Sequence, residues 1–233
     1  MTMATALQAD PLVPQLHAGV AALEISLSDD QEATLLAYLR LMEKWNRTHN
    51  LTAIREPERM VSAHLLDSLA VIPALPLPQG ATVIDVGTGG GLPGMALAVA
   101  RPDLQVTLLD SNQKKTAFLL QAAGELGIAN VTVVASRAEE HRPARGYGLV
   151  ICRAFSELAE FARLAGHLVA DGVADGINEG GWLAAMKGVH PDEEITKLGE
   201  AWRVDRVVKL AVPGLDAERH LVLMQRATGN ANP

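Results

Sequence analysis

The sequence predicts an α/β fold with a mostly parallel sheet that is covered by helices on both faces. From residue 81 onward, short apolar runs alternate with helical patterns, which is typical of parallel strands joined by crossover helices. The expected strands cover residues 82–86, 105–110, 131–136, 148–153 and 182–187, and the expected helices lie near 93–100, 112–126 and 156–170. Two further apolar segments, 204–212 and 218–226, flank a Pro-Gly turn and predict an antiparallel pair at one edge of the sheet.

Two helices are expected before the sheet. Ser28 is a predicted N-cap with Gln31 closing a capping box, and apolar residues then recur at helical spacing. They are Leu35, Leu36, Leu39, Met42 and Trp45. A second helix begins near Pro57, with an apolar stripe formed by Val61, Leu65, Leu69 and Ile72. We therefore expect a flexible N-terminal segment over 1–27, a helical extension over 28–79 and an α/β domain over 80–233.

Composition narrows the class of protein. The chain has 233 residues and a net charge of −7, which argues weakly against binding to nucleic acid. Residues 80–170, however, carry as many basic as acidic side chains, which leaves room for a local basic rim. The single cysteine, Cys152, excludes an internal disulfide and is expected to be a buried strand residue. Because no long apolar stretch and no secretory signal are visible, we expect a soluble cytoplasmic protein.

A glycine-rich segment, 87–94, follows the first expected strand. In parallel α/β sheets ligands bind beyond the carboxyl ends of the strands, so Gly87, Gly89 and Gly91 lie where a ligand would approach the backbone closely. A P-loop would need Lys followed by Ser or Thr after the last glycine, which this segment lacks. Residues 89–94, GGGLPG, do satisfy the dinucleotide pattern. A dinucleotide, another nucleoside and a turn without any ligand therefore remain as alternatives.

Two acidic residues favour one of these ligands. Asp85 lies two positions before Gly87, where a pyrophosphate would meet a carboxylate at short range. S-adenosylmethionine carries no phosphate but has a cationic sulfonium and an ammonium group, so an acid at this position suits it better. Asp110, at the end of the second strand, is placed to accept hydrogen bonds from ribose hydroxyls. We therefore predict a site for S-adenosylmethionine.

Five segments of the chain carry a resemblance to a known family: 45–71, 83–94, 108–119, 136–140 and 152–155. They resemble the ribosomal RNA small subunit methyltransferase G family, also called glucose-inhibited division protein B. The resemblance implies a Rossmann-like class I S-adenosylmethionine-dependent methyltransferase, with a seven-stranded, mostly parallel sheet after an N-terminal helical extension. It also implies methylation of guanine N7 in 16S ribosomal RNA by a methyltransferase domain over 80–233. The family usually has proline where this chain has Gly90, so the backbone loses rigidity there.

The expected chemistry needs few catalytic groups. Guanine N7 has a lone pair and no proton to remove, so transfer to it can depend on positioning alone. Cys152 lacks a preceding proline and does not match the nucleophile of a pyrimidine C5 methyltransferase. No residue is therefore assigned as catalytic, apart from positioning by Arg153 at the end of the fourth strand. The expected cofactor contacts are Asp85, Gly87, Gly89, Gly91, Leu92, Asp110, Ser111, Ala138, Glu139 and Arg153.

Several polar residues are candidates for contact with RNA. Arg153 could bind guanine O6 or a phosphate, or instead form a surface ion pair with Glu157. Phe155 could stack on the guanine or pack in the core. His64 shares a helix face with Asp67 and Ser68, which either contact RNA or fasten the extension to the main domain. The remaining candidates are Arg137, Asn46, His49, Asn50, Arg55, Lys114 and Lys115.

The expected partner is 16S ribosomal RNA or the small ribosomal subunit. No membrane and no metal are expected, and a monomer suffices. Two alternatives stay open. One is a methyltransferase that acts on another substrate, and the other is a cofactor-binding regulatory protein without transferase activity.

Overall fold

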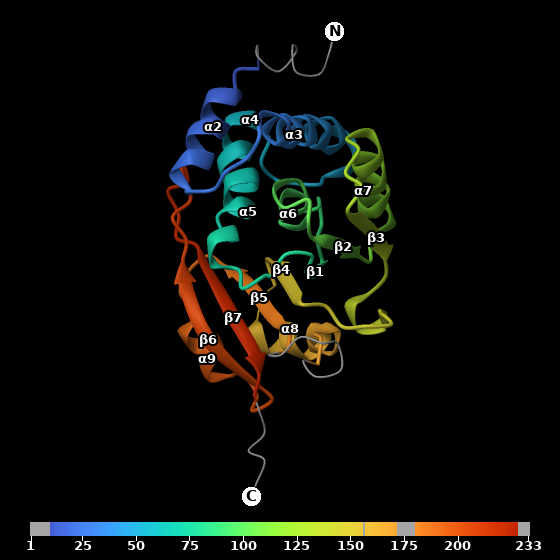
Figure 1. Ribbon diagram of the computed structural model, residues 1–233, viewed down its shortest axis with the longest axis vertical. Helices are drawn as coiled ribbons and strands as arrows, with labels where there is room; N and C mark the ends of the chain where they lie inside the picture. Colours follow the sequence, from blue (N-terminus) through green and yellow to red (C-terminus); the bar gives the residue numbers. More distant parts are fainter. Residues whose placement is uncertain (1–9, 156, 172–179, 228–233) are drawn as a thin grey trace, which may run out of the picture.

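The computed structural model describes residues 10–155, 157–171 and 180–227, and it contains a seven-stranded sheet in the order β3-β2-β1-β4-β5-β7-β6 (Figure 1). The strands are β1 (Thr82–Val86), β2 (Gln105–Asp110), β3 (Val131–Ala135), β4 (Leu149–Arg153), β5 (Trp182–Lys187), β6 (Trp202–Lys209) and β7 (His220–Arg226). Strands β1 to β5 pair in parallel, and β7 pairs antiparallel with both β5 and β6. The predicted fold class is confirmed, including the antiparallel pair at one edge.

Helices cover both faces of this sheet. The N-terminal part forms α2 (Val13–Ala22), α3 (Asp29–His49), α4 (Pro57–Met60), a π-helical turn η1 (Val61–Leu66), α5 (Asp67–Leu69) and η2 (Ile72–Ala74). These lie on the same face as α6 (Gly94–Ala100) and α7 (Gln113–Glu125), and α8 (Leu158–Ala165) covers the opposite face (Figure 1). Shorter elements are η3 (Ala138–Glu140), η4 (Gly166–Leu168) and α9 (Asp192–Thr196). Within the described ranges, no helix combines the length and the apolar character that crossing a membrane requires.

Helix α3 begins as the sequence predicts. The Ser28 hydroxyl accepts a hydrogen bond from the Gln31 backbone amide at 3.3 Å, and the Ser28 amide donates to the Gln31 side chain at 2.8 Å. The Gln31 side chain also donates to the Val99 and Ala100 carbonyls, which joins α3 to the end of α6. The helix continues through His49 and ends at Asn50 in the left-handed conformation.

Residues 13–22, within the segment over 1–27 that was expected to be flexible, form α2. Leu12, Leu16 and Val20 recur at a spacing of four residues and are buried. They form an apolar stripe, which packs α2 against η1 and α3. Residues 1–9 lie outside the described residues. Helix α2 therefore packs with the helices of the expected extension.

Candidate functional site

The glycine-rich loop joins β1 to α6 at the carboxyl end of the sheet. Gly87, Gly89 and Gly91 have φ angles of 66°, 61° and 91°. Such angles cost roughly 1–2 kcal/mol in residues that carry a Cβ atom. A Cβ atom on Gly91 would also lie 2.6 Å from both the Leu119 side chain and the Tyr38 hydroxyl. The loop therefore requires glycine for its backbone conformation and, at Gly91, for close packing.

Asp85 lies beneath this loop and is fully buried. Its Oδ2 accepts hydrogen bonds from the Thr88 hydroxyl at 2.6 Å and from the Gly94 amide at 2.8 Å. Its Oδ1 has no hydrogen-bond partner among the described residues. Burial raises the pKa of Asp85 to about 6, and the two hydrogen bonds and nearby Arg153 act in the opposite direction. One oxygen thus holds the loop, whereas the other is buried without a partner in the described residues, and the side chain is more deeply buried than the sequence suggested.

Asp110 holds the same loop from the neighbouring strand. Its Oδ2 accepts from the Gly89 amide at 2.9 Å, and its Oδ1 accepts from the Asn112 amide at 2.8 Å. Lys115 Nζ lies 3.7 Å from Oδ2. Lys115, a candidate for phosphate contact, therefore lies beside the loop and forms an ion pair with Asp110. Because an ionised carboxylate offers about four lone-pair sites, Asp110 can still accept hydrogen bonds from ribose hydroxyls.

The other expected cofactor residues lie along the same edge. Strands β3, β2, β1 and β4 are neighbours in the sheet, so their carboxyl ends bring together the segments that follow them. Ser111 is exposed, Leu92 is buried, Ala138 is half-buried and Glu139 is exposed. The buried, unpartnered oxygen of Asp85 suits a cation, because an unsatisfied buried acceptor costs roughly 1–3 kcal/mol. These carboxylate oxygens fit a cationic nucleoside better than a pyrophosphate.

The side chain of Arg153 extends from the end of β4 toward the helical extension. Its Nη1 lies 3.3 Å from Asp67 Oδ2 and 3.4 Å from the Ala63 carbonyl. The ion pair with Glu157, which the sequence left open, is not formed. Asp67 Oδ1 accepts a second hydrogen bond, from Arg219 Nε at 2.9 Å. Asp67 therefore fastens the extension to the main domain, and Arg219 is a residue that sequence reasoning missed.

Asn46 and His64, two of the candidates for RNA contact, are buried. The Asn46 amide group donates to the Thr52 carbonyl and accepts from the Thr52 amide, both at 2.9 Å. His64 Nε2 lies 2.8 Å from the Thr52 hydroxyl. Burial, followed by the charge of Arg153, lowers the pKa of His64 to about 4. Their polar atoms thus hold the segment after α3, while Ser68 is buried without a hydrogen-bond partner in the described part of the chain.

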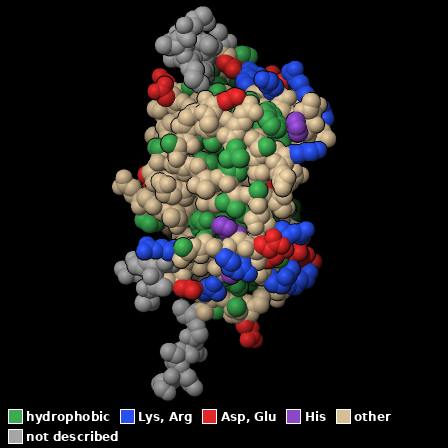
Figure 2. Space-filling view, turned by 90° about the vertical axis from the view of Figure 1, so that its right-hand side faces the viewer, with side chains coloured by type: hydrophobic (Ala, Val, Ile, Leu, Met, Phe, Trp, Pro, Cys, Tyr) green, Lys and Arg blue, Asp and Glu red, His purple; other side chains and the backbone are tan. Residues whose placement is uncertain are grey.

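The remaining candidates for RNA contact are exposed. They are His49, Asn50, Arg55, Lys114 and Arg137. The His49 ring lies 4.6 Å from the Trp45 ring, and Arg137 lies 4.0 Å from Glu139. On the face that carries α7 and β3, Figure 2 shows Lys and Arg gathered near the top and in the lower third, the lower group mixed with Asp and Glu. Basic side chains therefore form local groups on this face and no continuous stripe.

Cys152 lies in β4, and Phe155 comes two residues after the end of that strand. Both belong to the apolar cluster on the face of the sheet that α8 covers. The Phe155 ring lies 5.2 Å from the Phe161 ring, and a Cβ atom on Gly87 would lie 3.6 Å from Phe155. Phe155 is half-buried and borders the glycine-rich loop, so it is both packed and close to the site. Cys152 is buried, as predicted, and burial raises the pKa of its thiol.

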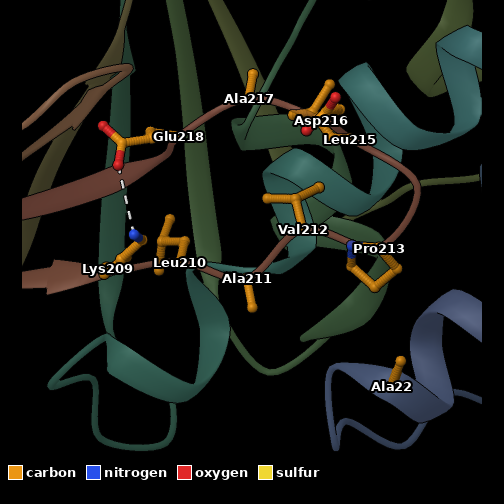
Figure 3. Close-up of a pocket in the computed structure, with 10 residues that line it drawn as sticks. All are labelled: Ala22, Lys209, Leu210, Ala211, Val212, Pro213, Leu215, Asp216, Ala217 and Glu218. Atoms are coloured by element: carbon orange, nitrogen blue, oxygen red, sulfur yellow. Dashed lines mark hydrogen bonds and ion pairs between the residues drawn. The ribbon is translucent and has the colours of Figure 1, made fainter.

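A separate cavity of about 710 Å³ lies beside the loop between β6 and β7 (Figure 3). Its lining includes Leu210, Val212 and Leu215, with Ala22 of α2 on one side. Lys209 and Glu218 form an ion pair of 3.4 Å next to it. None of its lining residues belongs to the glycine-rich loop, so this cavity is distinct from the candidate site. Across the described ranges, no group of three His, Cys, Asp or Glu side chains is arranged to hold a metal ion.

Comparison with solved structures shows the class of fold. A SAM dependent methyltransferase from Aquifex aeolicus has a TM-score of 0.52 and 20% sequence identity, with 78% of this chain and 97% of that chain covered. Coclaurine N-methyltransferase, bound to N-methylheliamine and SAH, has a TM-score of 0.51 and 15% identity, with 90% and 70% covered. The fold is therefore that of class I S-adenosylmethionine-dependent methyltransferases.

Sequence comparison shows the family. The family model for rRNA small subunit methyltransferase G matches residues 31–222. The protein named Ribosomal RNA small subunit methyltransferase G from Nitrosospira multiformis is 52% identical over 213 residues, which cover 91% of this chain and 97% of that protein. The protein of the same name from Laribacter hongkongensis is 53% identical over 211 residues, with 91% and 97% covered. On this evidence, the chain belongs to the rRNA small subunit methyltransferase G family.

Proposed function

We propose that this protein transfers a methyl group from S-adenosylmethionine to N7 of one guanine in 16S ribosomal RNA. The family supports the reaction class and the acceptor. The observation that carries the proposal is the Asp85 carboxylate, which is buried beneath the glycine-rich loop with Oδ1 unpartnered. The charge of this carboxylate would attract a cationic ligand at the loop, whereas it would repel a pyrophosphate.

The site residues would bind the cofactor in three ways. Asp85 accepts from, or lies against, its cationic groups, and Asp110 accepts from its ribose hydroxyls. The glycines at 87, 89 and 91 let the backbone approach it closely. When bound, S-adenosylmethionine supplies a methyl group on a positively charged sulfur.

The chain has little other chemistry to perform at the acceptor. Guanine N7 presents a lone pair and no proton, so no general base is required and the rate depends on alignment. Arg153 is half-buried at the end of β4 and anchored by Asp67. From there its guanidinium can donate to guanine O6 or to a phosphate, which orients the base while N7 stays free. We further infer a cytoplasmic monomer that uses no metal ion.

A labelled-methyl assay tests the proposal. Small ribosomal subunits from cells that lack the modification, the naked 16S RNA and free nucleosides would each be offered with labelled S-adenosylmethionine. Nucleoside analysis should find 7-methylguanine at one position of the RNA. Transfer to a different acceptor would favour another methyltransferase. Binding of the cofactor with no transfer to any of these acceptors would favour a regulatory protein.

A further inference from the structure

Two arginines from distant parts of the chain share one buried carboxylate. Asp67 Oδ2 lies 3.3 Å from Arg153 Nη1, and Asp67 Oδ1 lies 2.9 Å from Arg219 Nε. The side chain of Asp67 is only 3% exposed, whereas those of Arg153 and Arg219 are 26% and 27% exposed. The carboxylate is thus buried, while both arginine side chains still reach solvent.

The charges in this cluster do not cancel. Two guanidinium groups and one carboxylate leave a net charge of one positive unit, and neither arginine has another carboxylate within ion-pair distance in the described ranges. Arg219 Nη1 donates to the Glu218 carbonyl at 2.8 Å, but its Nη2 donates to no described residue. Nε and Nη2 of Arg153 likewise donate to no described residue. One ion pair would be enough to fasten the β6–β7 hairpin to the helical extension. The second arginine therefore leaves guanidinium N–H groups that are suited to binding an anion.

The cluster lies beside the cofactor site. Arg153 ends β4, which pairs with β1, the strand that carries Asp85. Arg153 is close enough to Asp85 to counteract part of the rise in the pKa of that carboxyl group. Arg219 directly precedes β7, and only β5 separates β7 from β4 in the sheet. Both free guanidinium edges are therefore near the end of the sheet at which the acceptor base must arrive.

We propose that Arg153 and Arg219 together bind a backbone phosphate of the RNA next to the target guanine, with Asp67 as the positioning residue. The inference rests on the proposed function for the identity of the acceptor. A phosphodiester carries one negative charge, which matches the excess charge of the cluster. Guanidinium groups form strong, directional hydrogen bonds to phosphate oxygens, and prior fixation by Asp67 lowers the entropy that binding would cost.

Arg219→Gln tests this proposal through the salt dependence of binding. We expect the KM for small subunits that lack the modification to rise about tenfold, which corresponds to the loss of about 1.4 kcal/mol. The slope of log affinity against log salt should become shallower by roughly 0.7 to 0.9, the value for one phosphate contact. The affinity for S-adenosylmethionine, measured by calorimetry without RNA, should be unchanged.

Matched variants separate binding from folding. Arg203→Gln removes an exposed arginine of β6 that pairs with Asp205, and it should leave both KM and salt slope unchanged. Arg219→Lys keeps the charge, so it should preserve the slope while recovering only part of the affinity. Asp67→Asn keeps the shape of the anchor but releases both guanidinium groups, and it should raise the KM for small subunits.

The possible failures are distinguishable. If Arg219→Gln lowers the melting temperature but leaves KM and salt slope at wild-type values, the pair only fastens the hairpin and the inference is overturned. If the wild-type protein methylates no RNA, the proposed function fails instead. In that case equilibrium binding to small subunits still decides the phosphate pair, because an unchanged salt slope in Arg219→Gln, or no binding at all, would overturn it.

Discussion

The hydroxyl of Tyr38, on α3, donates a hydrogen bond to the carbonyl of Gly90 in the glycine-rich loop. Tyr38 is fully buried, and burial raises the pKa of its phenol, so the group stays protonated and acts as a donor. The Met42 side chain approaches Gly90 from the same helix. The helical extension thus holds the loop at the position where the family pattern has proline, which compensates for the freedom of glycine there.

Tyr38→Phe should therefore weaken the binding of S-adenosylmethionine. The variant removes one buried hydrogen bond and leaves the Gly90 carbonyl unsatisfied, at a cost of about 1 kcal/mol. We expect the dissociation constant to rise about fivefold in calorimetry, with little change in the KM for RNA. Tyr147→Phe is the control, because it removes a hydroxyl that bonds Thr107 and His141 rather than the glycine-rich loop. An equal loss of cofactor affinity in both variants would contradict a specific role for Tyr38.

The affinity for the cofactor should rise with pH through about 6, because Asp85 must be ionised to attract a cation. Its pKa is about 6 rather than the ordinary 3.8, since burial disfavours the charged form, and the charges that act on it are Arg153 and Asp110. Calorimetric titrations from pH 5 to pH 8 would measure this rise. Asp85→Asn should bind weakly at every pH, and a wild-type affinity that did not vary would count against the role of Asp85.

The same carboxyl group should reduce the stability of the ligand-free protein at neutral pH. Because the folded-state pKa lies above the unfolded value, the free energy of unfolding falls as pH rises from about 4 to about 6, by about 3 kcal/mol. Denaturant unfolding should show this decrease in the wild type relative to Asp85→Asn. His64 acts in the opposite direction, since its pKa is lowered from 6.5 to about 4 and it favours folding more as pH rises through that range. His64→Gln should therefore expose the Asp85 effect more fully.

Gly91→Ala should impair both folding and cofactor binding. The φ angle of 91° is unfavourable for alanine, and the added methyl group would overlap Leu119 and Tyr38. We expect the free energy of unfolding to fall by more than roughly 1–2 kcal/mol, the cost of the backbone conformation alone. The control is Gly124→Ala on α7, where a Cβ atom meets nothing within 4 Å. That substitution should raise stability by roughly 0.5–1 kcal/mol, so a similar effect of the two changes would contradict the packing at Gly91.

Much of the fold could be predicted because it depends on neighbouring residues. The capping box of Ser28 and Gln31, the strands of the sheet and the Pro-Gly turn are each encoded within a few positions. The glycines after β1 and the acids that end β1 and β2 also have a fixed spacing. The chemical nature of the cofactor site therefore followed from local sequence.

Contacts between distant segments could not be predicted in this way. Asp67 and Arg219 are 152 positions apart, and nothing near either residue indicates the other. Asn46 and His64 are polar residue types that usually lie at the surface, but the fold buries them. Thr88, three positions after Asp85, and Asn112, two positions after Asp110, are missed partners that local spacing could have indicated.

The sequence by itself determined the class of fold, the family and the presence of a nucleoside site, because these follow from periodicity and short motifs. Only the tertiary structure decided which polar groups are buried, which oxygen of Asp85 remains unpartnered and which arginines meet on Asp67. Those features depend on how the helical extension packs on the sheet, and the energy of that packing comes from residues spread over the whole chain.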